Sequence, residues 1–308
     1  MLENLLIVAQ QVGVLFLLMA VGFFLGKRRL LDEHTVFQMS TLLLYVITPC
    51  VVLNSLQVEY SAHLASALLW GFAFLAAQYA VLILLSQCTF RHAPPEQRGP
   101  LRFAQVYSNN VFMGLPLLQA VLGSAGAIFV VPSLIAFQIS MWTHGVLVMG
   151  GKVSPKKVLY TPAILASILG FALFFAQIPL PPVVGQAVSF LADVNTPLAM
   201  VIIGLQMSWG DLKRTFTNRQ LYGVTAIRLL LSPLVTLAIM FPFRSFDPNL
   251  FCAFVILSAA PVGGATSIFA QRFEQDTVTA AQAVSLSTLL SLFTLPVFAV
   301  AAKTIVGS

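Results

Sequence analysis

The alternation of apolar and polar stretches along the chain predicts a bundle of membrane-spanning helices. Each apolar run has about 20 residues, the length that an α-helix needs to cross the hydrocarbon core of a bilayer. The runs lie at residues 4–26, 35–57, 62–87, 100–122, 125–150, 158–178, 182–207, 221–243, 249–271 and 277–302. Ten such runs with short linkers predict an all-α integral membrane protein of ten transmembrane helices, without an extramembrane domain.

The fourth run contains a stretch, Tyr107–Leu118, that is a poor helix. Gly114 weakens the helix, and Pro116 interrupts its hydrogen-bond ladder because proline has no N–H and its ring clashes with the preceding turn. Asn109 and Asn110 add amide groups at a depth where unpaired polar atoms are costly. Broken backbone at membrane depth is stable only where protein buries it or where it lines a wet cavity, so we expect a buried site here.

The ninth run contains a second interrupted stretch, Ser258–Ser267, in which Pro261 follows Pro116 by 145 residues. A single proline is more typical of a plain kink, whereas two matched breaks in two halves of a chain are typical of a transporter's binding site. We therefore expect helices 4 and 9 to cross at their breaks. The residues expected to form the substrate site there are Asn109, Asn110, Gly114, Pro116, Pro261, Gly263 and Gly264. For the asparagines, the alternative is helix-to-helix hydrogen bonding.

The two halves of the chain also resemble each other in sequence. Leu18–Leu25 (LMAVGFFL) aligns with Ala166–Leu173 (ASILGFAL) at an offset of 148, and the same offset brings Thr48 onto Thr196, each followed by proline. Each half has five helices, an odd number, so the second half must enter the membrane from the opposite side. The sequence thus predicts two inverted five-helix repeats, residues 1–150 and 151–308, with the site at the midplane between them.

Composition and charge agree with a membrane protein and indicate its orientation. The chain is 58% hydrophobic and only 8% charged, against about 25% charged in soluble domains. Its net charge of +6 comes from short basic clusters between apolar runs, without the basic face that nucleic-acid binding needs. The loops after odd-numbered helices hold thirteen of the sixteen lysines and arginines, which predicts that these loops are cytoplasmic and that both termini are periplasmic.

Two charged residues lie inside predicted helices. Asp193 precedes the Thr196–Pro197 pair of helix 7; an intramembrane carboxylate is a candidate for binding a coupling proton or sodium, and the alternative is a buried acid paired with Asn195 or a loop arginine. Arg228 of helix 8 is a candidate for binding a substrate carboxylate with its guanidinium. At its depth, near the cytoplasmic side, snorkelling to the membrane surface is slightly favoured.

Other polar residues are better explained by structure than by chemistry. Gln206 lies near the end of helix 7, which favours a place at the membrane interface. Gln282, Ser285, Thr288 and Ser291 form a polar stripe on helix 10, which helix packing explains better than a transport pathway. The cysteines are isolated, and neither a metal-binding spacing nor a hydrolase or nucleotide-binding motif occurs, so no enzyme activity, metal or cofactor is expected.

Four motifs in this order resemble the auxin efflux carrier family, and in particular its bacterial malate and malonate permeases. They are Gly22–Lys27 (GFFLGK), Tyr107–Leu117 (YSNNVFMGLPL), Thr196–Gly204 (TPLAMVIIG) and Ser287–Pro296 (STLLSLFTLP). The resemblance covers the whole chain. It implies a fold like that of the bile acid/sodium symporters, with crossing broken helices 4 and 9, and it supplies the substrate class of small mono- or dicarboxylates.

Together these observations predict a secondary transporter of small organic anions that works by alternating access in the bacterial inner membrane. Helices 3–5 and 8–10 would move against helices 1, 2, 6 and 7. A proton or sodium ion is the expected coupling ion, and membrane lipid is expected around the protein. The sequence is compatible with a homodimer, and no nucleic acid is expected as a partner. The alternative is an uncoupled channel or facilitator for small solutes.

Overall fold

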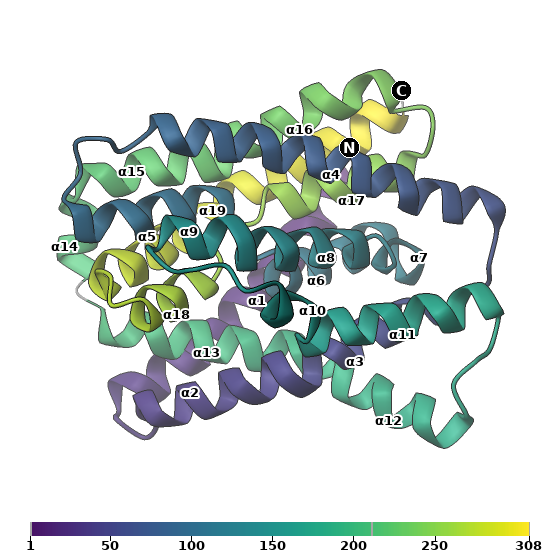
Figure 1. Cartoon of the computed structure of the whole chain (residues 1–308), viewed down its shortest axis with the longest axis horizontal. Coiled ribbons are helices and arrows are strands. Elements are labelled where there is room, and N and C mark those ends of the chain that lie inside the picture. The colour runs from purple at the N-terminus through teal and green to yellow at the C-terminus, as the bar shows by residue number, and fades with distance from the viewer. Residues whose placement is uncertain (1, 211, 308) are drawn as a thin grey trace.

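The computed structural model describes residues 2–210 and 212–307, so that Met1, Asp211 and Ser308 lie outside it. The described residues form helices and loops and no strand (Figure 1). The first half contains α1 (Leu2–Lys27), α2 (Glu33–Leu42), η1 (Leu43–Ile47), α3 (Thr48–Ser55), α4 (Ala62–Cys88), α5 (Pro95–Val106), η2 (Asn110–Gly114), α6 (Leu115–Leu122), α7 (Ser124–Ala127), α8 (Val130–Ser140), η3 (Met141–Gly145) and α9 (Val146–Val148). The second half contains α10 (Pro155–Leu159), α11 (Pro162–Ala176), α12 (Pro182–Asp193), α13 (Asn195–Trp209), α14 (Leu212–Thr217), α15 (Arg219–Ala226), η4 (Ile227–Leu231), α16 (Ser232–Met240), η5 (Phe241–Phe243), α17 (Pro248–Ser258), α18 (Ala265–Arg272) and α19 (Thr277–Gly307).

Seven helical segments of the described chain are long and apolar enough to cross a membrane. They are Val8–Lys27, Glu33–Ser55, Ala62–Cys88, Val130–Val148, Pro182–Trp209, Arg219–Phe243 and Thr277–Gly307. Three shorter apolar helices, Asn110–Leu122, Pro162–Ala176 and Pro248–Ser258, fall within the fourth, sixth and ninth apolar runs. The fourth and ninth runs yield short helices because their backbone is interrupted near the middle.

Three of the helices accommodate a proline by widening the turn before it. The π-helical turns η1, η2 and η4 end two residues before Pro49, Pro116 and Pro233. In each of them the residue just before the proline donates its N–H to the carbonyl five residues earlier: Thr48 to Leu43, Leu115 to Asn110, and Ser232 to Ile227. A wider turn removes the clash between the proline ring and the preceding turn, so these prolines bulge the helix without ending it.

The helices pack into two groups, one above the other in Figure 1. The lower group consists of α1, α2, α3, α11, α12 and α13, which we call the scaffold group. The upper group contains α4, α5, α6, α8 and α15 to α19, which we call the crossing group. Residues of α1, α6, α13 and α19 contact one another where the two groups meet, and Met113 of η2 packs into the hydrophobic core of the scaffold.

Helices α1 and α13 approach so closely that only small residues fit between them. A Cβ atom on Gly22 would lie 2.1 Å from the carbonyl oxygen of Val201, and one on Gly204 would lie 2.0 Å from that of Met19. Gly22 and Gly26 form the small-xxx-small pattern that lets helices pack backbone to backbone in membranes. This contact joins a helix of the first half to a helix of the second.

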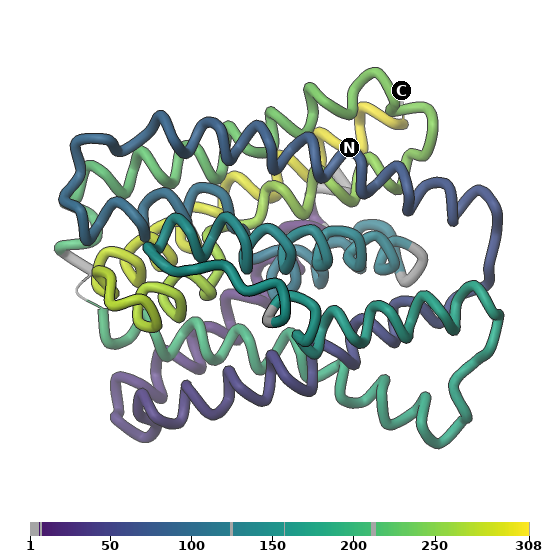
Figure 2. Tube along the Cα trace, viewed as in Figure 1, coloured from purple at the N-terminus to yellow at the C-terminus, as the bar shows by residue number. Residues whose placement is uncertain are grey.

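Two of the predicted basic loops lie together at one end of the bundle. In Figure 2 the α1–α2 turn, which begins after Lys27 and contains Arg28 and Arg29, and the α4–α5 turn, which contains Arg91, lie at the left end. The α3–α4 and α11–α12 loops, without lysine or arginine, lie at the right end. Which end faces the cytoplasm remains a prediction from the charge distribution.

Candidate functional site

The first break in the backbone lies between α5 and η2. Helix α5 ends at Val106, the next three residues are not helical, and η2 begins at Asn110. The sequence prediction put the break at Gly114 and Pro116, and this is wrong. Both residues lie inside continuous helix, because the π-helical turn absorbs the proline, and the backbone leaves the helix earlier, at Tyr107–Asn109.

Gly114 and Pro116 still belong to the crossing, through packing. A Cβ atom on Gly114 would lie 2.8 Å from Cδ2 of Leu257 and 3.9 Å from Cβ of Ala260, at the end of α17. Pro116 is buried at the start of α6, directly after the π-helical turn that accommodates its ring. Gly114 therefore lets the two broken helices touch.

The second break lies between α17, which ends at Ser258, and α18, which begins at Ala265. Here the prediction is accurate, because Pro261, Gly263 and Gly264 lie in the non-helical segment itself. This run of small residues and proline has no preceding π-helical turn to restore the helix.

The two breaks meet in a short antiparallel bridge between Ser108 and Val262. The N–H of Asn109 donates to the carbonyl of Pro261 (2.7 Å), and the N–H of Gly263 donates to the carbonyl of Tyr107 (3.0 Å). The backbones are so close that a Cβ atom on Gly263 would lie 3.0 Å from the oxygen of Ser108. Each break therefore satisfies backbone groups of the other, as buried backbone requires.

The two asparagines of the first break have different surroundings, although both are buried. Asn110 donates from Nδ2 to Oγ of Ser133 on α8 (2.8 Å), which is the helix-to-helix bond left open by the sequence. The Nδ2 of Asn109, by contrast, has no hydrogen-bond partner among the described residues, although the side chain is only 3% exposed. Such a donor is costly unless a ligand or a water binds it.

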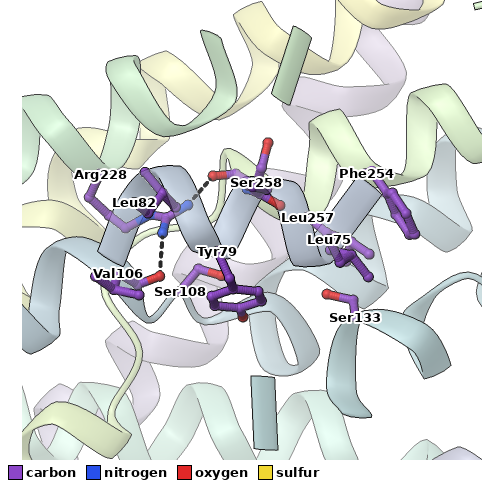
Figure 3. A pocket seen from close by; sticks show the side chains of 11 residues that line it. Leu75, Tyr79, Leu82, Val106, Ser108, Ser133, Arg228, Phe254, Leu257 and Ser258 are labelled. Carbon is purple, nitrogen blue, oxygen red and sulfur yellow. Dashed lines mark hydrogen bonds between the residues drawn. The ribbon is translucent and has the colours of Figure 1, made fainter. Parts of the chain in front are cut away.

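Arg228 lies at the C-terminal ends of both interrupted helices. Its Nη1 donates to the carbonyl of Val106, the last residue of α5 (3.0 Å), and its Nη2 donates to the carbonyl of Ser258, the last residue of α17 (Figure 3). Nη2 also donates to Oγ of Ser232 on α16. The side chain is 1% exposed, so the preference for snorkelling to the surface is wrong: two helix ends hold the guanidinium inside the protein.

A small cavity of about 10 Å³ lies beside the guanidinium, with room for about one water molecule. The polar walls of the cavity are Gln78, Tyr79, Ser108, Ser133 and Ser258, and the apolar walls are three leucines, Val106 and Phe254 (Figure 3). This cavity is therefore too small for a carboxylate, and a larger ligand would fit beside the guanidinium only if the surrounding helices separated.

Asp193 lies away from the crossing in the structure. It is the exposed last residue of α12, a helix that packs mainly on α3 and α13. The predicted pairing with Asn195 does not occur, since both polar side-chain atoms of Asn195 are buried without a partner in the described chain. The break between α12 and α13 turns the two side chains apart: one is exposed and the other points into the protein.

Several residues at the crossing were not singled out from the sequence. Ser287 of α19 accepts from the N–H of Val262 through its Oγ (3.0 Å), although the stripe expected on this helix consists of its neighbours. The hydroxyl of Tyr107 donates to the carbonyl of Ser140 (2.8 Å) and lies 3.0 Å from Nδ1 of His144. Gln206, which the sequence places near the end of helix 7, is half-buried, and a Cβ atom on Gly264 would lie 4.0 Å from its Oε1.

Among residues 2–210 and 212–307, no three histidine, cysteine, aspartate or glutamate side chains gather in a way that could hold a metal ion. The polar groups at the crossing are instead amides, hydroxyls, backbone N–H groups and one guanidinium. This donor set suits an anionic or polar ligand.

Comparisons with known proteins agree with this architecture. The model of the family described as membrane transport protein matches residues 7–158 and 146–299 of the chain. The chain is also similar to an uncharacterized transporter of Methanothermobacter thermautotrophicus, with 25% identity over 207 residues, which are 65% of this chain and 67% of the relative.

Proposed function

Because the chain belongs to the membrane transport protein family, we propose that it is a secondary transporter that moves small organic anions, such as mono- or dicarboxylates, by alternating access. The substrate class follows from the resemblance to the auxin efflux carriers and their bacterial permeases. The observation that carries the proposal is the crossing of two interrupted helices beside a buried amide donor without a partner, the Nδ2 of Asn109.

The electric field at the crossing supports an anionic substrate. Helices η2–α6 and α18 both begin at the crossing, and their first N–H groups have no carbonyl partner within the helix. The start of a helix carries a partial positive charge, and two such starts attract an anion. Met113 and Gly264 face the scaffold group there, so the anion would bind between the two groups of helices.

The substrate site consists, in this proposal, of both asparagines and the glycines and prolines of the two broken segments. Asn109 would donate directly to a carboxylate, whereas Asn110 would hold the first turn of η2 against α8 through Ser133. Gly114, Pro116, Pro261, Gly263 and Gly264 would let the backbones approach each other and the substrate.

Alternating access would come from movement of the crossing group against the scaffold group. The ten helices would form two inverted repeats, residues 1–150 and 151–308, with both termini in the periplasm of a bacterial inner membrane. Two interrupted helices that cross within inverted repeats suit this mechanism better than a channel. A proton or sodium gradient would drive the cycle, and Asp193 is the candidate coupling residue; a facilitator without coupling is the second candidate.

The test measures substrate affinity and uptake separately. A panel of carboxylates is first screened for thermal stabilisation of the purified protein at two pH values, with and without sodium. Replacing Asn109 with alanine removes one hydrogen bond to a charged group, worth about 1.5–3 kcal/mol, and should weaken binding roughly ten- to a hundredfold. Ser133→Ala is the matched control, since it removes only a partner of Asn110.

Pro116→Ala separates binding from movement. Without the proline ring, the helix no longer needs the wider π-helical turn before it and should become straighter. The straighter helix should slow the movement that uptake requires and leave substrate affinity unchanged. If Asn109→Ala and Asn110→Ala both bind the substrate as tightly as the natural protein, the crossing is only a hinge and the substrate site lies elsewhere.

A further inference from the structure

The two negative helix ends at the crossing meet a single positive charge. The C-terminal end of a helix carries about half a negative elementary charge, so the ends of α5 and α17 together carry about one. The guanidinium of Arg228 donates to the last carbonyl of both helices, Val106 and Ser258. One fixed positive charge therefore balances two half charges that lie side by side.

This guanidinium has no other source of charge balance. Among the described residues no carboxylate forms an ion pair with Arg228, and the polar groups around it are hydroxyls, carbonyls, the amide of Gln78 and the phenol of Tyr79. Burying a lone cation costs several kcal/mol unless nearby groups compensate its charge. The guanidinium and the two helix ends therefore stabilise each other. The negative ends compensate the charge of Arg228, and Arg228 compensates the charge of the ends.

We propose that Arg228 is the resident cation of the crossing and takes the place in which a transporter would otherwise bind a sodium ion. In transporters with broken helices, carbonyls at half-helix ends coordinate the coupling cation. Here those carbonyls already bind a guanidinium, which stays charged at all physiological pH values and cannot leave. The inference rests on the proposed function and narrows it: the crossing binds its anion without sodium.

The same arrangement makes the crossing selective for anions. Once Arg228 has cancelled the negative ends of α5 and α17, the uncompensated charges that remain are the positive starts of η2–α6 and α18. Arg228 comes from η4 in the crossing group, whereas Met113 of η2 packs into the scaffold. The cation therefore acts from behind the site, as a positioning residue, and need not touch the substrate.

The first test uses no substrate. Sodium is exchanged for choline at constant ionic strength, from almost none to roughly 200 mM, and the melting temperature of the purified protein is followed, since an ion that binds the folded state raises it in proportion to the logarithm of its concentration. We expect no change between sodium and choline. A rise in melting temperature that is specific to sodium and persists in the Asp193→Asn variant would overturn the proposal, whatever the substrate site proves to be.

The second test removes the guanidinium and supplies it again. Arg228→Ala should lower the melting temperature and reduce uptake at least tenfold, and millimolar guanidinium ion should restore part of both. Urea, of the same shape without charge, should restore neither. Arg219→Ala, which removes an exposed arginine of α15, is the matched control and should respond to neither additive.

Arg228→Met provides the decisive variant if the alanine protein does not fold, because methionine fills a similar space without charge. Under the proposal this variant is less stable than the natural protein, or its stability comes to depend on sodium. A stable, sodium-independent Arg228→Met protein with normal uptake would show that the helix ends need no cation. Loss of affinity in Asn109→Ala tests the substrate site separately, so the two proposals can fail independently.

Discussion

Replacing Gly263 with alanine adds one methyl group at the point where the two broken helices meet. The new Cβ would lie 3.0 Å from the carbonyl oxygen and 3.2 Å from the carbonyl carbon of Ser108, and 3.4 Å from the oxygen of Tyr107. All three neighbours are backbone atoms, so no side chain can rotate away. Gly264, the next residue, provides the comparison, because its added Cβ would meet nothing closer than Oε1 of Gln206 at 4.0 Å.

The expected cost follows from these contacts. Neither glycine has a positive φ, so alanine fits both backbone conformations, and both variants share the same small gain from a less flexible unfolded chain. At Gly263 the two strands of the bridge must also move apart by a few tenths of an ångström, and overpacking of this kind costs about 1–3 kcal/mol. Stretching the bonds from Asn109 to Pro261 and from Gly263 to Tyr107 belongs to the same cost.

The assay is a thermal melt of the two purified variants, with uptake into proteoliposomes measured in parallel. At roughly 2–4 °C for each kcal/mol in a chain of about this size, Gly263→Ala should melt about 2–12 °C below Gly264→Ala. Uptake by Gly263→Ala should fall as well, because the helix ends no longer meet at the site. Equal melting temperatures for the two variants would refute the view that the bridge holds the crossing together.

Two further outcomes are expected. A reporter fused after Ser308 should be active only in the periplasm, because thirteen of the sixteen lysines and arginines lie in the opposite loops; activity only in the cytoplasm would reverse the topology. Asp193→Asn should remove the dependence of uptake on the coupling ion while the melting temperature stays within about 1 °C, since the side chain is exposed; unchanged ion dependence would make Asp193 dispensable for coupling.

The membrane-spanning character and the two interrupted segments were predictable because they depend on local features of the sequence. The length of an apolar run shows whether a helix can cross the bilayer, and a segment such as Pro261–Gly264 cannot continue a helix. The position of the first break was not predictable from Pro116. Whether a proline breaks a helix or widens a turn depends on the room around it, and here α17 packs against Gly114.

The role of Arg228 was beyond local reasoning for a similar reason. Depth along one helix predicts snorkelling, and the alternative was a contact with substrate. The carbonyls that hold the guanidinium belong to Val106 and Ser258, which are 122 and 30 residues away in the chain. The crossing of α5 and α17 brings those two helix ends together. The sequence of helix 8 alone does not show that they lie beside Arg228.

The close contact between α1 and α13 has a consequence for how the protein is made. The Gly22–Gly26 face of α1 packs on a helix whose partner glycine, Gly204, is synthesised roughly 180 residues later. At about 5–20 residues per second, α1 waits on the order of ten to forty seconds in the bilayer before its partner is inserted. During that time its glycine face is open to any other helix in the membrane, including the α1 of a neighbouring nascent chain. The scaffold group is therefore complete only after α13 has been inserted, and its assembly is the step at which two copies can exchange helices.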